Sequence, residues 1–128
     1  MTAPPVSSPD RPQGVRVLIV EDEPLIAENL RTTLVEADFV IAGMASKVER
    51  ALKLVESVDC DVAIVDANLA GVSAGPAAAA LSARGRPFIV LSGYTREQLG
   101  REFSGGVFIQ KPYTTAQLLD GLNGILPK

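Results

Sequence analysis

Two segments of the chain decide its fold: VRVLIVEDE (residues 15–23) and DVAIVD (residues 61–66). Each contains a short, apolar and largely β-branched run, which is the composition of a strand covered on both faces in a parallel sheet. Each run also ends in acid, the first at Glu21 and Asp22 and the second at Asp66. The two segments therefore predict buried parallel strands whose carboxyl ends carry carboxylates.

On either side of these segments, strand-like and helix-like patterns alternate along the chain. Strands are expected at residues 15–20, 39–42, 61–65, 87–91 and 107–109. Helices are expected over residues 24–38 and 77–83. Two more are expected to begin at capping boxes, one formed by Ser46 and Glu49 and the other by Thr114 and Gln117. A further, short helix is expected to begin at Thr95 and Gln98. Strict alternation requires right-handed crossovers and helices on both faces of a parallel sheet. The predicted fold class is α/β, with a five-stranded parallel sheet in the order 2-1-3-4-5 and a short fourth helix.

The chain of 128 residues has room for one domain. Residues 1–14 combine proline, serine and glycine with little to bury, so we expect a flexible arm ahead of a domain over residues 15–128. The single cysteine, Cys60, excludes an intramolecular disulfide, and no apolar run approaches the ~18 residues of a membrane span. We therefore expect a cytoplasmic protein that does not enter a membrane.

The absence of histidine excludes several kinds of functional site. Catalysis by Ser-His-Asp or Cys-His groups, imidazole metal sites and a phosphohistidine on this chain are all ruled out. The 12 basic and 15 acidic residues give a net charge of −3, which argues against a nucleic-acid partner because such partners favour a basic surface. Carboxylates, hydroxyls and lysines are left to carry the chemistry.

Reactive side chains follow four of the five expected strands. They are Glu21 and Asp22 after the first strand, Asp66 after the third, Ser92 after the fourth and Lys111 after the fifth. The carboxyl ends of parallel strands meet at one edge of the sheet, where doubly wound folds bind their ligands. Two anions ~4 Å apart at that edge repel by about 4 kcal/mol at an effective dielectric constant of 20. A hard divalent cation would offset this repulsion, and a few carboxylates with water suit Mg²⁺.

The four segments at these strand ends carry a resemblance to a known family. They are VLIVEDE (17–23), DVAIVD (61–66), VLSGY (90–94) and QKPY (110–113). In this order they resemble the receiver domain of two-component response regulators, a CheY-like domain with a flavodoxin-like fold. The resemblance covers the chain from residue 15 to its end.

The resemblance implies a phosphate-accepting site with bound Mg²⁺. Asp66 occupies the position of the family's phosphoryl acceptor. Asp22 together with Glu21 would hold the Mg²⁺ ion, and the backbone carbonyl of Asn68 would be a further ligand. The donor of the phosphoryl group would be a phosphohistidine on a histidine kinase or a histidine phosphotransfer protein.

The resemblance also implies roles for residues around the acceptor. Ser92 would donate a hydrogen bond to the phosphoryl group, and Lys111 would pair with it. Phe108 would be the aromatic switch that reports phosphorylation to the surface, although ordinary core packing also accounts for a phenylalanine there. Asn68 and Tyr94 occupy the positions that tune the lifetime of the phosphoryl group.

The sequence departs from the common family pattern in two places. Ala70 stands where a proline is usual, and the stretch from Ser92 to Lys111 is shorter than in many receivers. With PFIVLSGY (87–94), the chain resembles a stand-alone receiver subgroup whose fourth helix is reduced or mobile. We therefore expect a single-domain response regulator, monomeric or weakly dimeric, that signals through protein contacts and has no effector domain.

Three other functions remain open at this stage. A receiver-like adaptor that is never phosphorylated would carry the same residues. A small phosphatase with an aspartyl nucleophile usually has an acid two residues after that nucleophile, where this chain has Asn68. A cofactor-binding flavodoxin needs a phosphate loop rich in hydroxyls and glycine after the first strand, where this chain has the acidic residues 21–23.

Overall fold

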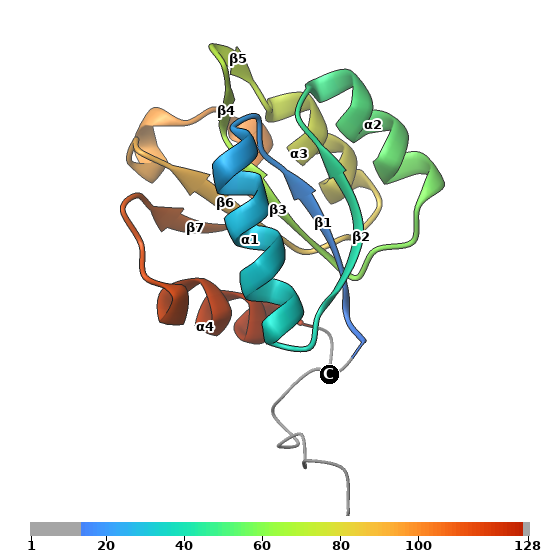
Figure 1. The fold of residues 1–128 in the computed structure, drawn as a ribbon. Helices are drawn as coiled ribbons and strands as arrows, with labels where there is room; N and C mark the ends of the chain where they lie inside the picture. Colours follow the sequence, from blue (N-terminus) through green and yellow to red (C-terminus); the bar gives the residue numbers. More distant parts are fainter. Residues whose placement is uncertain (1–13, 127–128) are drawn as a thin grey trace, which may run out of the picture.

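A five-stranded parallel sheet forms the centre of the molecule (Figure 1). The structure is a computed structural model that describes residues 14–126. The strands are β1 (Arg16–Val20), β2 (Val40–Ala45), β3 (Val62–Asp66), β6 (Phe88–Ser92) and β7 (Val107–Gln110). They lie in the order β2-β1-β3-β6-β7, which confirms the predicted order 2-1-3-4-5. The arm predicted for residues 1–14 lies, apart from Gly14, outside the described residues, so this division of the chain stays a prediction.

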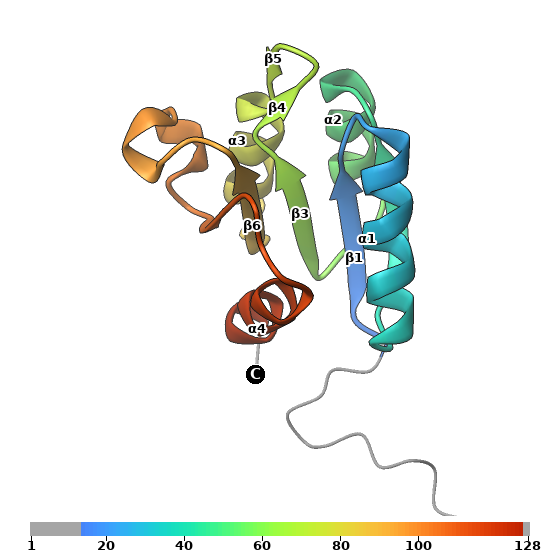
Figure 2. The same ribbon diagram turned by 60° about the vertical axis from the view of Figure 1, so that its left-hand side comes forward.

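Within residues 14–126, four α-helices cover the two faces of the sheet (Figures 1 and 2). They are α1 (Pro24–Glu36), α2 (Val48–Ser57), α3 (Gly75–Ala83) and α4 (Thr115–Ile125). Alternate strand residues point to opposite faces, so Val17 and Ile19 of β1 pack with α1 and α4, while Leu18 and Val20 pack with α2 and α3. Burial on both faces explains why the strand sequences are continuously apolar.

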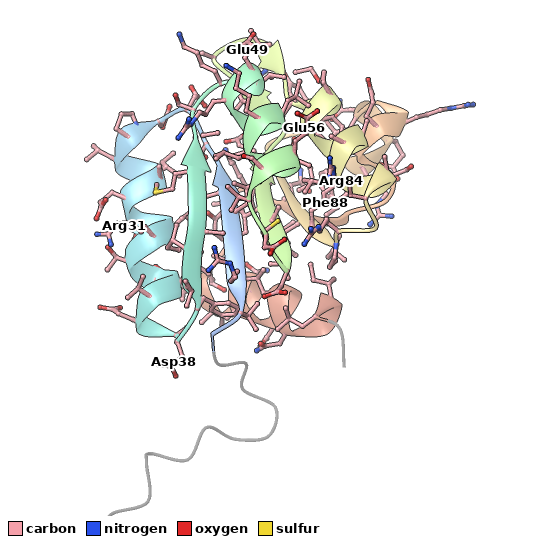
Figure 3. All side chains as sticks on the ribbon, turned by 90° about the vertical axis from the view of Figure 1, so that its right-hand side faces the viewer. Arg31, Asp38, Glu49, Glu56, Arg84 and Phe88 are labelled. Carbon is pink, nitrogen blue, oxygen red and sulfur yellow. The ribbon has the colours of Figure 1, made fainter. Side chains whose placement is uncertain are left out.

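Helix α2 has an ordinary amphipathic pattern, and helix α4 begins with a capping box. In α2, Glu49 and Glu56 lie on the solvent side (Figure 3), while Ala51, Leu54 and Val55 are buried against the sheet. The capping box predicted for α4 is present, because the side chains and backbone amides of Thr114 and Gln117 bond reciprocally. Over residues 14–126, no helix combines the length and the apolar character needed to cross a membrane.

The ends of three predicted elements were wrong by a few residues. Helix α1 stops at Glu36 instead of residue 38, because Asp38 adopts a positive φ of 73° that a helix cannot contain. Strand β2 accordingly spans Val40–Ala45 instead of residues 39–42. The capping box predicted for α2 is absent, since Lys47 is the N-cap and makes no side-chain capping bond.

A small hairpin replaces the loop that was predicted after the third strand. Strands β4 (Asn68–Leu69) and β5 (Val72–Ser73) pair in antiparallel fashion and protrude beyond the edge of the main sheet (Figures 1 and 2). The two residues between them, Ala70 and Gly71, have φ angles of 53° and 88°. Positive φ at both central positions is the conformation of the tightest hairpin turns.

The short fourth helix predicted from the sequence is two turns of 3₁₀ helix. These turns are η1 (Arg96–Gln98) and η2 (Arg101–Phe103), separated by extended backbone at Leu99 and Gly100. The predicted bonds between Thr95 and Gln98 open η1. Phe103 is 7% exposed and anchors η2 to the core. The chain therefore crosses from β6 to β7 without a full α-helix.

Candidate functional site

The carboxyl ends of the parallel strands form one side of an open pocket of about 310 Å³. Val20 of β1 pairs with Val65 of β3, so the residues that follow them, Glu21 and Asp66, lie on adjacent strands at the same level. Of the eight residues singled out from the sequence, seven line this pocket: Glu21, Asp22, Asp66, Asn68, Ser92, Tyr94 and Lys111. The topology rule for doubly wound sheets thus located the pocket correctly.

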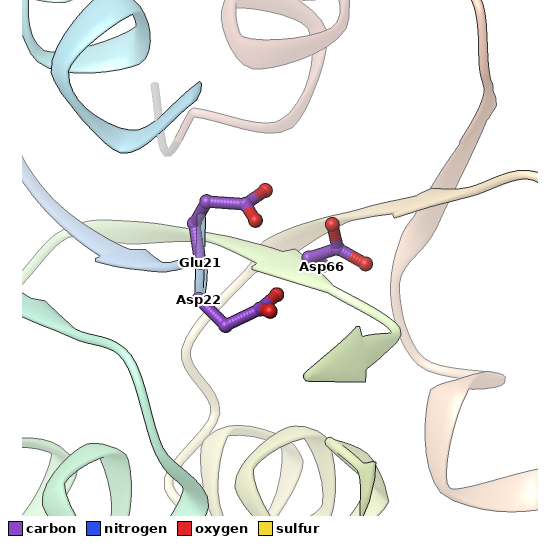
Figure 4. A group of neighbouring side chains, drawn as sticks. All are labelled: Glu21, Asp22 and Asp66. Carbon is purple, nitrogen blue, oxygen red and sulfur yellow. The ribbon is translucent and has the colours of Figure 1, made fainter. Parts of the chain in front are cut away.

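Three carboxylates converge in the pocket. Figure 4 shows the side chains of Glu21 and Asp22 extending toward Asp66. Their carboxylate oxygens lie within 4.8 Å of one another, close enough to bind one metal ion together. Glu21 and Asp66 are buried, with 3% and 5% of their surface exposed, whereas Asp22 is half-buried. Water therefore screens the repulsion between Glu21 and Asp66 poorly.

Lys111 brings a positive charge into contact with the acidic cluster. Its Nζ atom lies 2.5 Å from Asp66 Oδ2, and its backbone N–H donates to the Ser92 carbonyl at 2.8 Å. Partial burial alone would lower the pKa of Lys111, but the hydrogen bond to Asp66 and the charges of Asp66 and Glu21 outweigh it and raise that pKa. Lys111 is therefore a cation whose side chain is aimed at Asp66.

Glu21 is the least satisfied group in the pocket. Its pKa is raised to about 7, mainly because burial disfavours the charged form; the Glu23 backbone N–H opposes this rise and Asp66 adds to it. That N–H donates to Glu21 Oε2 at 3.1 Å, whereas Glu21 Oε1 is buried without a hydrogen-bond partner among the described residues. A cation that binds oxygen would satisfy this atom, so the donor set fits Mg²⁺.

Backbone amides complete the surroundings of the two other buried polar side chains. The N–H of Asn68 donates to Asp66 Oδ1 at 3.0 Å, while the side-chain oxygen of Asn68 accepts from the Gly71 N–H at 2.7 Å. The N–H of Tyr94 donates to Ser92 Oγ at 2.9 Å, which leaves the Ser92 hydroxyl hydrogen available for another acceptor. The Tyr94 side chain is 55% exposed at the mouth of the pocket.

Phe108 lies apart from these residues. It occupies β7, is half-buried against the core, and lines a separate hollow of about 230 Å³ beside η1 and η2. Sequence reasoning also missed the turn at Ala70 and Gly71, which supports Asn68. The available signal was a glycine in a two-residue turn between potential strand residues.

Comparison with known proteins agrees with the sequence motifs. A family model described as the response regulator receiver domain matches residues 17–123. The chain belongs to this family. It is a two-component response regulator receiver domain, and the family resemblance inferred from its four strand-end motifs is confirmed.

Two solved structures share the fold of this chain. The structure of SdrG from Sphingomonas melonis is 37% identical, covers 85% of this chain and 93% of its own, and has a TM-score of 0.72. TrrA from Thermotoga maritima, solved in complex with Mg²⁺ and BeF, is 26% identical, covers 88% of this chain and 99% of its own, and has a TM-score of 0.77.

A curated relative is longer than this chain. The transcriptional regulatory protein PdtaR from Mycobacterium tuberculosis is 29% identical over 124 residues, which cover 92% of this chain. The match spans 60% of the length of PdtaR. The similarity therefore covers only part of that protein.

Proposed function

We propose that this receiver accepts a phosphoryl group on Asp66 from a phosphohistidine of a partner protein, in a reaction that depends on Mg²⁺. The observation that carries the proposal is the convergence of three carboxylates and Lys111 in one open pocket. Phosphoryl transfer needs in-line placement and neutralisation of charge more than it needs an acid or base. A pocket with these groups is suited to both.

Glu21, Asp22 and Asp66 would hold the Mg²⁺ ion, with the backbone carbonyl of Asn68 as a further ligand. Glu21 Oε1, which has no hydrogen-bond partner within residues 14–126, and the oxygen-only donor set support this assignment. The relative TrrA was solved with Mg²⁺ and BeF, which supports a similar ion at this site. When bound, Mg²⁺ supplies positive charge that stabilises the transferring phosphoryl oxygens.

Asp66 acts as the nucleophile. A carboxylate oxygen of Asp66 forms the new bond to phosphorus while the P–N bond to the donor imidazole breaks, and the imidazole keeps the electron pair and takes up a proton. Lys111, whose Nζ contacts Asp66 Oδ2 before transfer, would pair with the phosphoryl oxygens afterwards. The free hydroxyl hydrogen of Ser92 would donate to another of these oxygens.

The signal would leave the site through the neighbouring loop and strand. A hydrogen bond from Ser92 to the phosphoryl group would draw the β6 carboxyl end inward, and Phe108 would then change its rotamer at the surface of β7. The half-buried position of Phe108 beside a hollow of about 230 Å³ leaves room for such a change. Tyr94, at the pocket mouth, would tune water access and the phosphoryl lifetime.

Because the chain itself has no histidine, the phosphohistidine would belong to a separate protein. This donor would be a histidine kinase or a histidine phosphotransfer protein in the cytoplasm. The chain would catalyse only its own phosphorylation and dephosphorylation and act on target proteins by contact. As a separate phosphatase it is disfavoured, since the residue two positions after Asp66 is the amide Asn68, whose side-chain oxygen is held by Gly71.

Incubation with acetyl phosphate and Mg²⁺, followed by intact-mass measurement, tests the proposal. We expect the wild type to gain the mass of one phosphoryl group in Mg²⁺ and none in EDTA, while Asp66→Asn gains none in either. Asp61→Asn is the matched control, because Asp61 is exposed at the opposite end of β3 and should leave phosphorylation unchanged. A well-folded wild type that gains no mass would favour the unphosphorylated adaptor.

A further inference from the structure

Asn68 links the acceptor carboxylate to the tip of the β4–β5 hairpin. Its backbone N–H donates to Asp66 Oδ1 at 3.0 Å, and its side-chain oxygen accepts from the Gly71 N–H at 2.7 Å. The same residue therefore holds the carboxylate with its backbone and the turn with its side chain. Because the Gly71 N–H engages this oxygen, the side-chain oxygen of Asn68 is directed to the turn.

The hairpin is fixed to the body of the protein at its base. Leu69 is 3% exposed and packs in the core beneath the hairpin. The backbone N–H of Ala74 donates to the Ala67 carbonyl at 2.9 Å and closes the base. With the base of the hairpin held in this way, the two-residue turn is the part of the hairpin that can move. A change in the conformation of this turn would therefore shift the backbone of Asn68.

The turn adopts a conformation that one of its residues disfavours. Gly71 has a φ of 88°, which suits a residue without a Cβ, but Ala70 has a φ of 53°, where a Cβ crowds the backbone. The bond from Gly71 to the Asn68 side chain closes the same turn and offsets this crowding. Without that bond, the turn is expected to relax.

Each oxygen of Asp66 has its own donor. Asn68 holds Oδ1, and Lys111 holds Oδ2 at 2.5 Å, so the plane of the carboxylate is set by two hydrogen bonds. Loss of either bond would let the carboxylate rotate about its own axis. A nucleophile that rotates spends less time in the orientation needed for in-line attack.

We propose that Asn68 is a positioning residue, whose side-chain bond to Gly71 keeps its backbone N–H on Asp66 and so orients the acceptor carboxylate. The consequence for phosphoryl transfer rests on the proposed function. In this arrangement the Asn68 side chain affects the reaction through the hairpin and Asp66, without contacting the phosphoryl group.

Two variants and one control test this inference. Asn68→Ala removes the side-chain bond but keeps the backbone N–H. The double variant Asn68→Ala/Ala70→Gly also removes the crowded Cβ, so its turn can close without that bond. Asn123→Ala makes the same chemical change at an exposed site on α4.

Two measurements are made on each protein. In the metal-free protein, the ¹H–¹⁵N chemical shift of the backbone amide of residue 68 reports the charge-assisted hydrogen bond from this amide to Asp66. The shift of the same amide in Asp66→Asn is the reference for a weakened bond. In Mg²⁺ and acetyl phosphate, intact mass gives the initial rate of phosphorylation. Asn68→Ala should move the amide upfield and lower the rate about tenfold, the effect of one lost hydrogen bond.

The double variant should recover most of both effects, and Asn123→Ala should show neither. A lower rate with an unmoved amide would mean that the Asn68 side chain acts directly on the reacting group, and this would overturn the inference. Failure of Ala70→Gly to restore the amide position would also overturn it. If the wild type takes up no phosphoryl group, the proposed function fails, but the NMR measurement still decides the positioning of Asp66.

Circular dichroism and thermal unfolding verify that each variant folds. Should Asn68→Ala not fold, Gly71→Ala strains the same turn at a φ of 88° while leaving Asn68 intact. The added Cβ meets no atom within 4 Å, so any effect arises from the backbone alone. The same upfield movement and the same loss of rate are expected, and an unchanged amide would overturn the inference.

Discussion

Glu21→Gln should stabilise the metal-free protein at high pH and not at low pH. The carboxylate of Glu21 is 3% exposed, and its pKa of about 7 lies well above the ordinary value of 4.5 because burial disfavours its charged form. An acid whose pKa is raised by folding stabilises the folded state fully below pH 4.5. That stability is lost as the pH rises from 4.5 through about 7, since the buried group must then ionise.

The size of the effect follows from the two pKa values. A rise from 4.5 to about 7 corresponds to about 3 kcal/mol of unfolding free energy lost at pH 8 in the absence of metal. A glutamine of the same shape does not ionise, so Glu21→Gln should be more stable than the wild type at pH 8 by up to about 3 kcal/mol. At pH 5 the two proteins should differ much less.

Urea unfolding followed by circular dichroism, at pH 5 and pH 8 in EDTA, measures this difference. Glu56→Gln, an exposed change on α2, is the matched control. Its unfolding free energy should differ from that of the wild type by the same amount at both pH values. Added Mg²⁺ should stabilise the wild type at pH 8 far more than it stabilises Glu21→Gln, because the bound ion supplies the partner that the ionised carboxylate lacks. An equal difference between wild type and Glu21→Gln at both pH values would show that ionisation of Glu21 does not destabilise the folded protein.

Three further substitutions test other parts of the structure. Thr114→Ala removes the cap of α4 and should lower the unfolding free energy by about 1 kcal/mol in urea titrations; an unchanged midpoint would show that the cap contributes nothing. Gly106→Ala places a Cβ against the Phe88 ring and should cost about 1–3 kcal/mol in the same assay, whereas wild-type stability would contradict the close packing. Lys111→Met removes the cation paired with Asp66 and should slow phosphorylation by acetyl phosphate about a hundredfold in Mg²⁺, while an unaltered rate would dismiss the proposed role of the lysine.

The sheet and its order could be predicted from the sequence because both faces of every central strand are buried. Val17 and Ile19 pack on one face and Leu18 and Val20 on the other, so the apolar run is continuous and unmistakable. The pocket followed from the same fact, since parallel strands bring their carboxyl ends together. Both predictions depend on long-range topology, which alternation of strands and helices restricts to few solutions.

The predictions that failed concern local backbone geometry. The α2 capping box needs its acid three residues after the N-cap, but the helix begins after Lys47, so Glu49 stands only two residues after the cap. The hairpin was missed because alanine rarely adopts the positive φ found at Ala70. These features depend on a few dihedral angles that composition and periodicity do not encode.

The segment between β6 and β7 shows the same limit. Thr95 and Gln98 predicted a helix start, and the predicted bonds are present, but the following residues form 3₁₀ turns. Gly106 lies against Phe88 with no space for a side chain, which holds the segment close to the core. The small number of residues between β6 and β7 predicted a reduced helix. The 3₁₀ form of that helix depends on the packing of Gly106 against Phe88.

Chemical location of the phosphoryl group tests whether Asp66 is the acceptor. Protein treated with acetyl phosphate in Mg²⁺ is reduced with borohydride, which converts an aspartyl phosphate to homoserine, and is then mapped by peptide mass spectrometry. We expect homoserine at position 66 and nowhere else, with none formed in EDTA. Homoserine at another aspartate, or formation at position 66 that is independent of Mg²⁺, would contradict this expectation.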